Sequence, residues 1–281
     1  MEYDAQANLA RIQSAIAMEQ PDQVPVFLHT TGPFMAGHVD MDLYDYFHSP
    51  AQMFKAQNYM YQRFSGLSQY MPDLGSAPEA AGIGAPITFT DDGIPWVEAF
   101  VETEADLEKL TLPDVENAGY MTRFLQNYRY MRNRVDFDIP VYFYSVMSPW
   151  AIAALIRGVS NLMTDIISNP DFVHQLVRKC TQLEIMWLKT MQSEVPPKYF
   201  DRILLNDDIA SFVSRNSSES LYCRPIRKYT MRFRIANAGI TTMAMPQPFS
   251  RGSHKRGSSA STSGTRSIRC ISRKRLEIVS V

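Results

Sequence analysis

One apolar run in the second half of the chain ends abruptly in polar residues, and it constrains the fold more than any other stretch. Residues 203–205 are apolar, and Asn206, Asp207 and Asp208 follow them directly. A buried parallel strand has this pattern, because it is covered on both faces and delivers polar side chains at its carboxyl end. We therefore predict a strand over residues 200–205 that carries two aspartates to the edge of a parallel sheet.

Predicted helices and strands alternate through the residues before this strand. Ser49 precedes Pro50 and caps a helix that runs to Gly66. Asn169 caps another helix in the same way. Helical spacing of apolar residues predicts further helices over residues 7–18, 104–109, 118–134, 150–157, 159–167 and 170–191. Strands are predicted over residues 26–28, 68–74 and 139–146, and a hairpin over residues 87–97 around the turn Asp91-Asp92-Gly93.

This alternation predicts an α/β fold with a parallel sheet. The helices are long and the strands are few for the length of the chain, which favours a (β/α)8 barrel over a doubly wound sheet. Neither G-x-G-x-x-G nor G-x-x-x-x-G-K follows a predicted strand, so a dinucleotide or P-loop site is not expected.

The composition is that of a soluble globular protein. The 281 residues are 45% hydrophobic and 20% charged. No apolar run reaches the roughly 18 residues that cross a bilayer, and the first four residues, M-E-Y-D, are unlike a basic signal peptide. We expect a cytoplasmic protein that has no membrane partner. Its three cysteines lie far apart without metal-site spacing, and we interpret Cys180 as a core thiol.

The net charge of −1 conceals two unlike segments. Residues 1–217 hold 15 Lys and Arg against 27 Asp and Glu, whereas residues 218–281 hold 13 against 2. The second segment is also rich in serine. This compositional boundary predicts one folded domain over residues 1–217 and a basic tail over residues 218–281.

Several segments before the boundary together resemble the uroporphyrinogen decarboxylase superfamily, which includes methylcobamide-dependent methyltransferases. They span residues 7 to about 217 and keep the order and spacing of the family. The matching segments are residues 11–26, 86–95, 108–114, 148–158 and 169–174, and Asn206-Asp207-Asp208. The resemblance implies a (β/α)8 TIM barrel with its site at the carboxyl ends of the strands, in agreement with the reading from the residues.

Two departures from the family pattern separate the two branches. The decarboxylases carry an arginine-rich loop, R-Q-A-G-R-Y, after the first strand, whereas residues 29–38 read H-T-T-G-P-F-M-A-G-H. A macrocyclic substrate with eight carboxylates needs cations in its site. The region of Leu155 also lacks the tyrosine that decarboxylases place there. The resemblance therefore favours a corrinoid-linked methyltransferase, and uroporphyrinogen decarboxylation in porphyrin (haem) biosynthesis is the alternative.

The codons of the tail can also be read in a second frame. Joining the third base of each codon to the first two of the next permits F-R-E-F-V-L-P-P-Y-K-E-I-Y-D-A-F-P-N-C-E-R-W-Y-H-N-D-G-D-A, which resembles the missing continuation of the family. Many of these letters depend on a choice among synonymous codons. The genetic code forces Leu from Tyr222-Cys223, Gly from Met243-Ala244 and Ala from Met245-Pro246.

We therefore predict a frameshift near Ser217. The chain would then hold the N-terminal half to two-thirds of an incomplete barrel, followed by an out-of-frame, non-native and disordered tail. An incomplete barrel leaves strand edges unpaired and an apolar face uncovered, so we expect the truncated chain to be inactive.

The candidate site residues lie on the predicted strands or directly after them. Asp207 and Asp208 could orient a substrate or act as acid and base, and a helix cap or a solvated loop is the alternative. His29 follows the first strand and could shuttle a proton, although a structural histidine is the more common case. We assign substrate binding to Asn206, Tyr142, Tyr144 and Thr30. For Tyr142 and Tyr144, filling of the barrel core is the default alternative.

We predict no metal ligand in this chain. In the methyltransferase branch, the resemblance implies a zinc site of His and Cys in the second half of the barrel, so zinc or a corrinoid belongs to a full-length parent. The implied partners are a small-molecule substrate and a corrinoid protein. A nucleic-acid-binding role of the basic tail is the remaining alternative, and the forced letters of the second frame oppose it.

Overall fold

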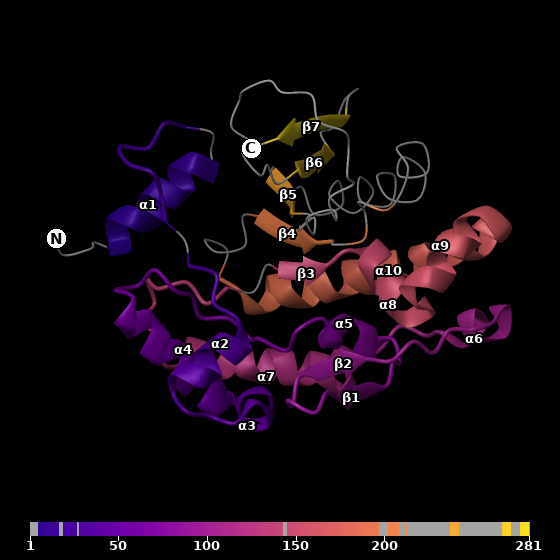
Figure 1. Ribbon diagram of the computed structural model, residues 1–281, viewed down its shortest axis with the longest axis horizontal. Coiled ribbons are helices and arrows are strands. Elements are labelled where there is room, and N and C mark those ends of the chain that lie inside the picture. Colours follow the sequence, from indigo (N-terminus) through magenta and orange to yellow (C-terminus); the bar gives the residue numbers. More distant parts are fainter. Residues whose placement is uncertain are drawn as a thin grey trace, which may run out of the picture. The chain divides into compact units, whose positions relative to one another are not determined.

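A computed structural model describes residues 5–16, 19–26, 28–142, 145–196, 202–207, 209, 212, 237–241, 266–270 and 276–280. The chain divides into two compact units (Figure 1). Unit 1 comprises residues 1–98 and 113–143, and unit 2 comprises residues 99–112 and 144–281. Each unit therefore combines segments that lie far apart in the sequence.

Unit 1 is built mainly from helices around an apolar core. Its helices are α1 (Ala5–Ile16), α2 (Gly32–His38), α3 (Leu43–His48), α4 (Pro50–Arg63), α5 (Ala77–Gly82), the 3-10 helix η1 (Val115–Asn117) and α7 (Tyr120–Arg132). Helix α4 packs against α3 and α7, and α7 packs against α5. Met53, Met60, Met121 and Met131 are all fully buried. These methionines fill the core, as flexible apolar side chains do.

A hairpin in unit 1 confirms the turn predicted at Asp91-Asp92-Gly93. Strands β1 (Ile87–Phe89) and β2 (Pro95–Val97) pair antiparallel. Gly93 has a φ of +83°, a left-handed conformation that glycine adopts without strain. The Gly93 N–H donates to the carbonyl of Thr90 at 2.8 Å and closes the turn.

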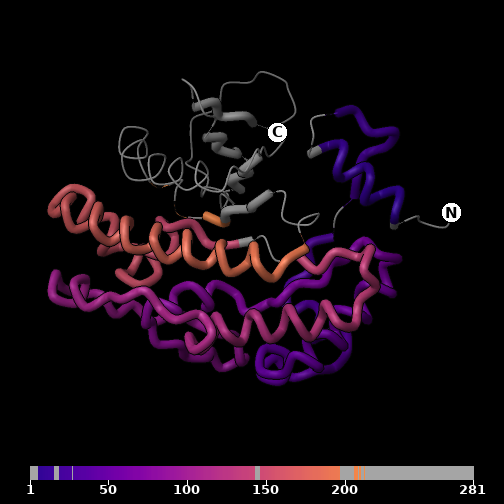
Figure 2. Tube along the Cα trace, turned by 180° about the vertical axis from the view of Figure 1, so that it is seen from behind, coloured from indigo at the N-terminus to yellow at the C-terminus, as the bar shows by residue number. Residues whose placement is uncertain are grey.

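Unit 2 combines helices with a parallel sheet. Its helices are α6 (Glu104–Lys109), α8 (Pro149–Arg157), α9 (Val159–Ser168) and α10 (Pro170–Glu194). The long helix α10, traced in Figure 2, packs against α8 and α9. Gly158, with a φ of +84°, separates α8 from α9. Cys180 of α10 is fully buried, which confirms it as a core thiol, and burial raises the pKa of this thiol.

The sheet of unit 2 has the parallel order β3-β4-β5 (Figure 1). Its strands are β3 (Ser145–Met147), β4 (Arg202–Asn206) and β5 (Asn237–Thr241). Strand β4 confirms the apolar run before Asn206 as a parallel strand with a neighbour on each side. The fold is therefore helix-rich α/β, with a parallel sheet in unit 2.

The structure differs from the expected disorder of the tail at three five-residue strands. Strand β5 lies in the tail, and β6 (Arg266–Cys270) pairs antiparallel with β7 (Leu276–Ser280). Ile268 lies opposite Ile278 in that pair, and β-branched residues of this kind favour extended backbone. The frameshift near Ser217 concerns the origin of the tail and stays a prediction.

Three predicted strands differ from the structure. The described residues of 26–28 and 68–74 form no strand: Leu28 N donates to Leu67 O at 3.1 Å, and Tyr70 forms an isolated parallel bridge with Val141. Of the strand predicted over residues 139–146, the described residues show this bridge and the start of β3. The sequence also did not predict α2, because Gly32, Pro33 and Gly37 disfavour a helix.

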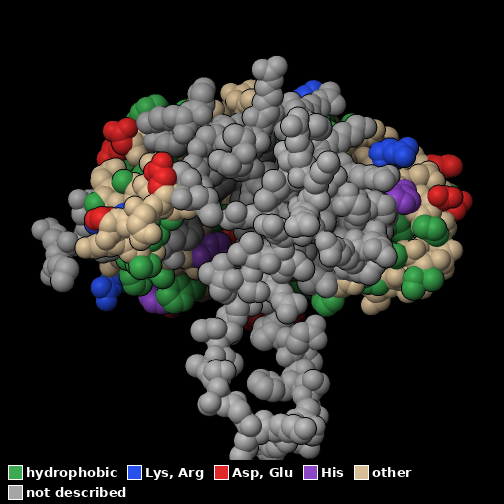
Figure 3. All heavy atoms as spheres, turned by 90° about the horizontal axis from the view of Figure 1, so that it is seen from above, with side chains coloured by type: hydrophobic (Ala, Val, Ile, Leu, Met, Phe, Trp, Pro, Cys, Tyr) green, Lys and Arg blue, Asp and Glu red, His purple; other side chains and the backbone are tan. Residues whose placement is uncertain are grey.

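Apolar side chains also remain on the surface (Figure 3). Val24, Trp96, Phe137 and Ile167 are among the most exposed of them. No single helix in the described ranges is long and apolar enough to cross a membrane. Helices α8 and α9 reach such a length and hydropathy only together, with a bend of 103° between them.

Candidate functional site

In unit 1, backbone hydrogen bonds join three segments that lie far apart in the sequence: the segment at Leu28, residues 67–73 and residues 141–142. Leu28 is hydrogen-bonded to Leu67, and Tyr142 N donates to Tyr70 O at 2.8 Å. His29 and Thr30 come directly after Leu28, and Asp73 lies near the end of the second segment. Polar side chains after adjacent parallel segments converge in this way in α/β enzymes.

Asp73 is the centre of this cluster. The hydroxyl of Tyr46 donates to Asp73 Oδ2 at 3.0 Å, and the N–H of Gly75 donates to Oδ1 at 3.4 Å. Tyr46 is fully buried on α3. The carboxyl group is thus held by donors from α3 and from its own loop.

Burial raises the pKa of Asp73 above its ordinary value. Donation from Tyr46 and from the N–H groups of Gly75 and Gly32 lowers the pKa, as does the nearby His29, but these effects offset only part of the burial. Burial and the charge of Asp73 also raise the pKa of Tyr46 well above its ordinary value. A carboxyl group of this kind can hold a proton that an ordinary aspartate would lose.

His29 is exposed and faces the same cluster. Its Nδ1 lies 3.3 Å from the amide nitrogen of Gln69, which also lies 3.0 Å from the sulfur of Met71. A hydrogen bond from the amide to Nδ1 would leave Nε2 as the protonated ring nitrogen. This geometry is compatible with both roles considered for His29 from the sequence, that of a proton shuttle and that of a structural histidine.

Thr30 is buried, in contrast to His29. Its hydroxyl lies 3.3 Å from the hydroxyl of Ser68 and donates to the sulfur of Met35 at 3.3 Å. These contacts tie the first extended segment to the second. Substrate binding by Thr30 stays a prediction, because its contacts are those of a packed side chain.

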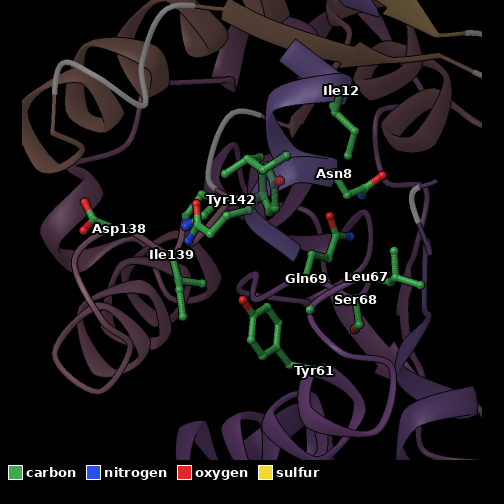
Figure 4. Close-up of a pocket in the computed structure, with 13 residues that line it drawn as sticks. Asn8, Ile12, Tyr61, Leu67, Ser68, Gln69, Asp138, Ile139 and Tyr142 are labelled. Atoms are coloured by element: carbon green, nitrogen blue, oxygen red, sulfur yellow. The ribbon is translucent and has the colours of Figure 1, made fainter. Parts of the chain in front are cut away.

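Tyr142 lies on a pocket next to these residues (Figure 4). The pocket is lined by α1, the end of α4, the start of the second segment and residues 138–142; Asn8, Tyr61, Ser68, Gln69 and Asp138 are among its polar residues. Because Ser68 contacts Thr30 and Gln69 contacts His29, the three predicted residues of unit 1 belong to one neighbourhood.

In unit 2, Asn206 and Asp207 lie at the carboxyl end of β4. The carbonyl of Asn206 accepts from the N–H of Ser148 at 3.0 Å. Asp207 is fully buried, its Oδ2 accepts from the Ser148 hydroxyl, and its Oδ1 accepts from Ile209 N at 3.0 Å. Asp207 is therefore not a solvated loop residue, and the N-cap of α8 is Ser148; the catalytic role of Asp207 stays a prediction.

Asp208 and Tyr144 lie outside the described residues. Asp73 and Tyr46 were not predicted as site residues from the sequence, nor was Gln57, whose amide nitrogen lies 3.2 Å from the Tyr46 hydroxyl oxygen. The available signal for Asp73 was its place near the end of the predicted strand over residues 68–74, whereas Asp207 was singled out because it follows its predicted strand. Nothing in the sequence linked Tyr46 or Gln57 to Asp73, because both lie on helices.

Among the described residues, no group of three His, Cys, Asp or Glu side chains could hold a metal ion. The part of the chain that the structure describes therefore does not supply the His and Cys ligand set of the methyltransferase branch.

Comparison with known proteins shows which fold and which family the chain resembles. The chain is similar to a methyltransferase from Methanosarcina mazei, with a TM-score of 0.67 and 19% sequence identity over 83% of this chain and 68% of that one. A search of curated protein sequences gives no significant match. The family model of uroporphyrinogen decarboxylase (URO-D) matches residues 8–195. The chain belongs to the uroporphyrinogen decarboxylase family.

Proposed function

We propose that this chain derives from a methyltransferase-type member of the family rather than from a true decarboxylase. The observation that carries the proposal is the lack of cationic side chains in the segments that build the site. Residues 12–54 and 64–108 contain no Lys or Arg, and they include His29, Tyr46, Gln69 and Asp73.

This charge pattern disfavours the decarboxylase substrate. A macrocycle with eight carboxylates needs charge-assisted donors, and arginine is the usual one. The charge that acts on Asp73 is that of His29, and burial nevertheless raises the pKa of Asp73. Neutral donors and a carboxyl group with a raised pKa suit a substrate with little negative charge. The likeness to the Methanosarcina mazei methyltransferase supports the same branch.

In this proposal, Asp73 is the group that gives or takes a proton at the substrate. His29 can exchange that proton with solvent, because it is exposed, and Tyr142 and Thr30 border the bound substrate. Asn206 and Asp207, at the carboxyl end of β4, remain candidates, as do Asp208 and Tyr144. A methyl-corrinoid carried by a partner protein would be the methyl donor.

We further propose that the present chain is an incomplete barrel and inactive. The change of net charge beyond residue 217 and the forced letters of the second frame support a frameshift there. Sequencing of the gene tests this directly. A second frame that is closed by stop codons, or that does not encode the expected peptide, would reject it.

The activity is tested on a frame-restored protein. We expect methyl transfer from methylcobalamin to a thiol and no turnover of uroporphyrinogen, with the Asp73→Asn variant strongly impaired. Loss of carboxyl groups from uroporphyrinogen would establish the decarboxylase alternative. The chain with its present tail serves as the matched control and is expected to be inactive in both assays.

Nucleic-acid binding by the tail is a second candidate function. It rests on the 13 Lys and Arg against 2 acidic residues in residues 218–281. Binding of RNA or DNA that weakens with salt and disappears on removal of residues 218–281 would support it. Binding that does not depend on the tail would not.

A further inference from the structure

We propose that Gln57 and Tyr46 form a buried hydrogen-bond relay that positions the carboxyl group of Asp73 and responds to its protonation. The inference rests on the proposed role of Asp73 as the proton-handling group. It adds two positioning residues that lie behind the carboxyl group.

The relay starts at Gln57 of α4, whose side chain is fully buried. Its amide nitrogen donates to Met71 O at 2.7 Å, and its amide oxygen accepts from Met71 N at 2.9 Å. The two bonds fix both ends of the amide group, so its orientation is set by the backbone two residues before Asp73. Gln57 therefore connects the segment that carries Asp73 to α4.

The second step is the Tyr46 hydroxyl. The Gln57 amide nitrogen lies 3.2 Å from the Tyr46 oxygen, and Tyr46 donates its own proton to Asp73 Oδ2 at 3.0 Å. Because Gln57 approaches as a donor, it occupies an acceptor site of the hydroxyl oxygen and directs the hydroxyl proton toward Asp73. The relay thus has one direction, from Gln57 through Tyr46 to Asp73.

Close packing holds the relay in this geometry. A Cβ atom at Gly32 would lie 2.7 Å from Tyr46 Cε1 and 3.0 Å from Asp73 Oδ2. No side chain fits at this position, so the backbone of Gly32, at the start of α2, packs directly against the Tyr46–Asp73 contact. Besides Tyr46, the titratable group that acts on Asp73 is His29.

A hydrogen bond to a carboxylate stabilises its ionised form. The hydrogen bond from the same donor to a protonated carboxyl group is weaker. The Tyr46 ring should therefore report the proton on Asp73. In the full chain, the ¹³Cζ resonance of Tyr46 is expected to shift with pH at the same midpoint as the ¹³Cγ resonance of Asp73. Tyr59, which is exposed on α4, is the internal control and should show no such step. Midpoints that differ, or a Tyr46 resonance that does not change, would overturn the relay.

Variants test its direction. Tyr46→Phe is expected to raise the Asp73 midpoint by about one pH unit, because a donor to the carboxylate is lost. Gln57→Leu should raise it by less, and the double variant should add nothing to Tyr46→Phe. Gln62→Leu, at an exposed site of α4, is the control for the glutamine. Independent, additive shifts in the two single variants would contradict a relay.

This test does not depend on turnover. If the two resonances share a midpoint but the frame-restored protein transfers no methyl group, the proposed function fails and the relay stands. If methyl transfer is found without the shared midpoint, the relay fails and the function stands.

Discussion

The hydroxyl of Ser148, the N-cap of α8, donates a hydrogen bond to the buried carboxylate of Asp207 at the end of β4. The same hydroxyl oxygen accepts from Ala151 N at 3.0 Å. One serine therefore caps a helix and satisfies a buried acid. Asp207 lies on the strand that most constrained the predicted fold, and its side chain supports the helix of the adjacent strand-helix unit.

Ser148→Ala is expected to destabilise the protein more than an ordinary cap mutation. Loss of a cap costs about 1–2 kcal/mol, and a buried carboxylate left with fewer donors raises the total to about 3 kcal/mol. Ser49→Ala is the matched control, since Ser49 caps α4 at 3.3 Å and should cost only about 1 kcal/mol. Urea unfolding of both variants measures the difference. Equal losses would mean that Asp207 does not depend on Ser148.

Asp73→Asn should change how stability depends on pH. Because the folded-state pKa of Asp73 is raised above 3.8, its contribution is fully present below that pH and is lost as the pH rises through the folded-state pKa. The wild type should therefore lose more stability than Asp73→Asn over this range.

Asp106 supplies the opposite control. Its hydrogen bond from Thr103 lowers its pKa, so its contribution is present above the unfolded-state pKa and is lost as the pH falls. Unfolding of wild type, Asp73→Asn and Asp106→Asn is compared at several pH values. Parallel profiles of wild type and Asp73→Asn would contradict the raised pKa.

Gly32→Ala is expected to disrupt the Tyr46–Asp73 contact. The added methyl group would lie 2.7 Å from Tyr46 Cε1, and such overpacking costs about 1–3 kcal/mol. Gly37→Ala is the control in the same helix, because a Cβ atom there meets nothing within 4 Å. Alanine should stabilise α2 at that position by up to about 1 kcal/mol. Thermal unfolding of the two variants should shift in opposite directions.

Arg157→Met should be among the most destabilising changes in unit 2. Arg157 Nε lies 2.7 Å from Asp165 Oδ2, and its NH1 donates to the carbonyl of Glu102 at 2.7 Å. Both side chains are largely buried, so removal of the cation leaves a buried charge and costs about 3–5 kcal/mol.

The exposed ion pair between Arg129 and Glu116 is the reference for that change. Arg129→Met should cost less than about 1 kcal/mol, because solvent screens the pair. Denaturant unfolding distinguishes the two variants. Similar losses would show that the Arg157 pair is no stronger than a surface pair.

Local chemistry allowed several elements to be predicted from the sequence. The turn at Asp91-Asp92-Gly93 and the caps at Ser49 and Asn169 depend on residues within a few positions of one another. Helix α6 likewise has the bounds that its charge and apolar spacing indicated. These features need no partner from elsewhere in the chain, so their residue types are sufficient.

Only the tertiary structure decided the composition of the candidate site. Asp73 meets Tyr46 across 27 positions, and Asp207 meets Ser148 across 59. The sequence by itself placed an aspartate at the end of a parallel strand, since apolar runs and polar ends are visible in one dimension. Asp73 lies in the cluster with Tyr46 and His29, whereas Asp207 supports the N-cap of α8. This difference depends on the neighbours that folding brings to each aspartate, because burial and hydrogen-bond donors set the chemistry of a carboxyl group.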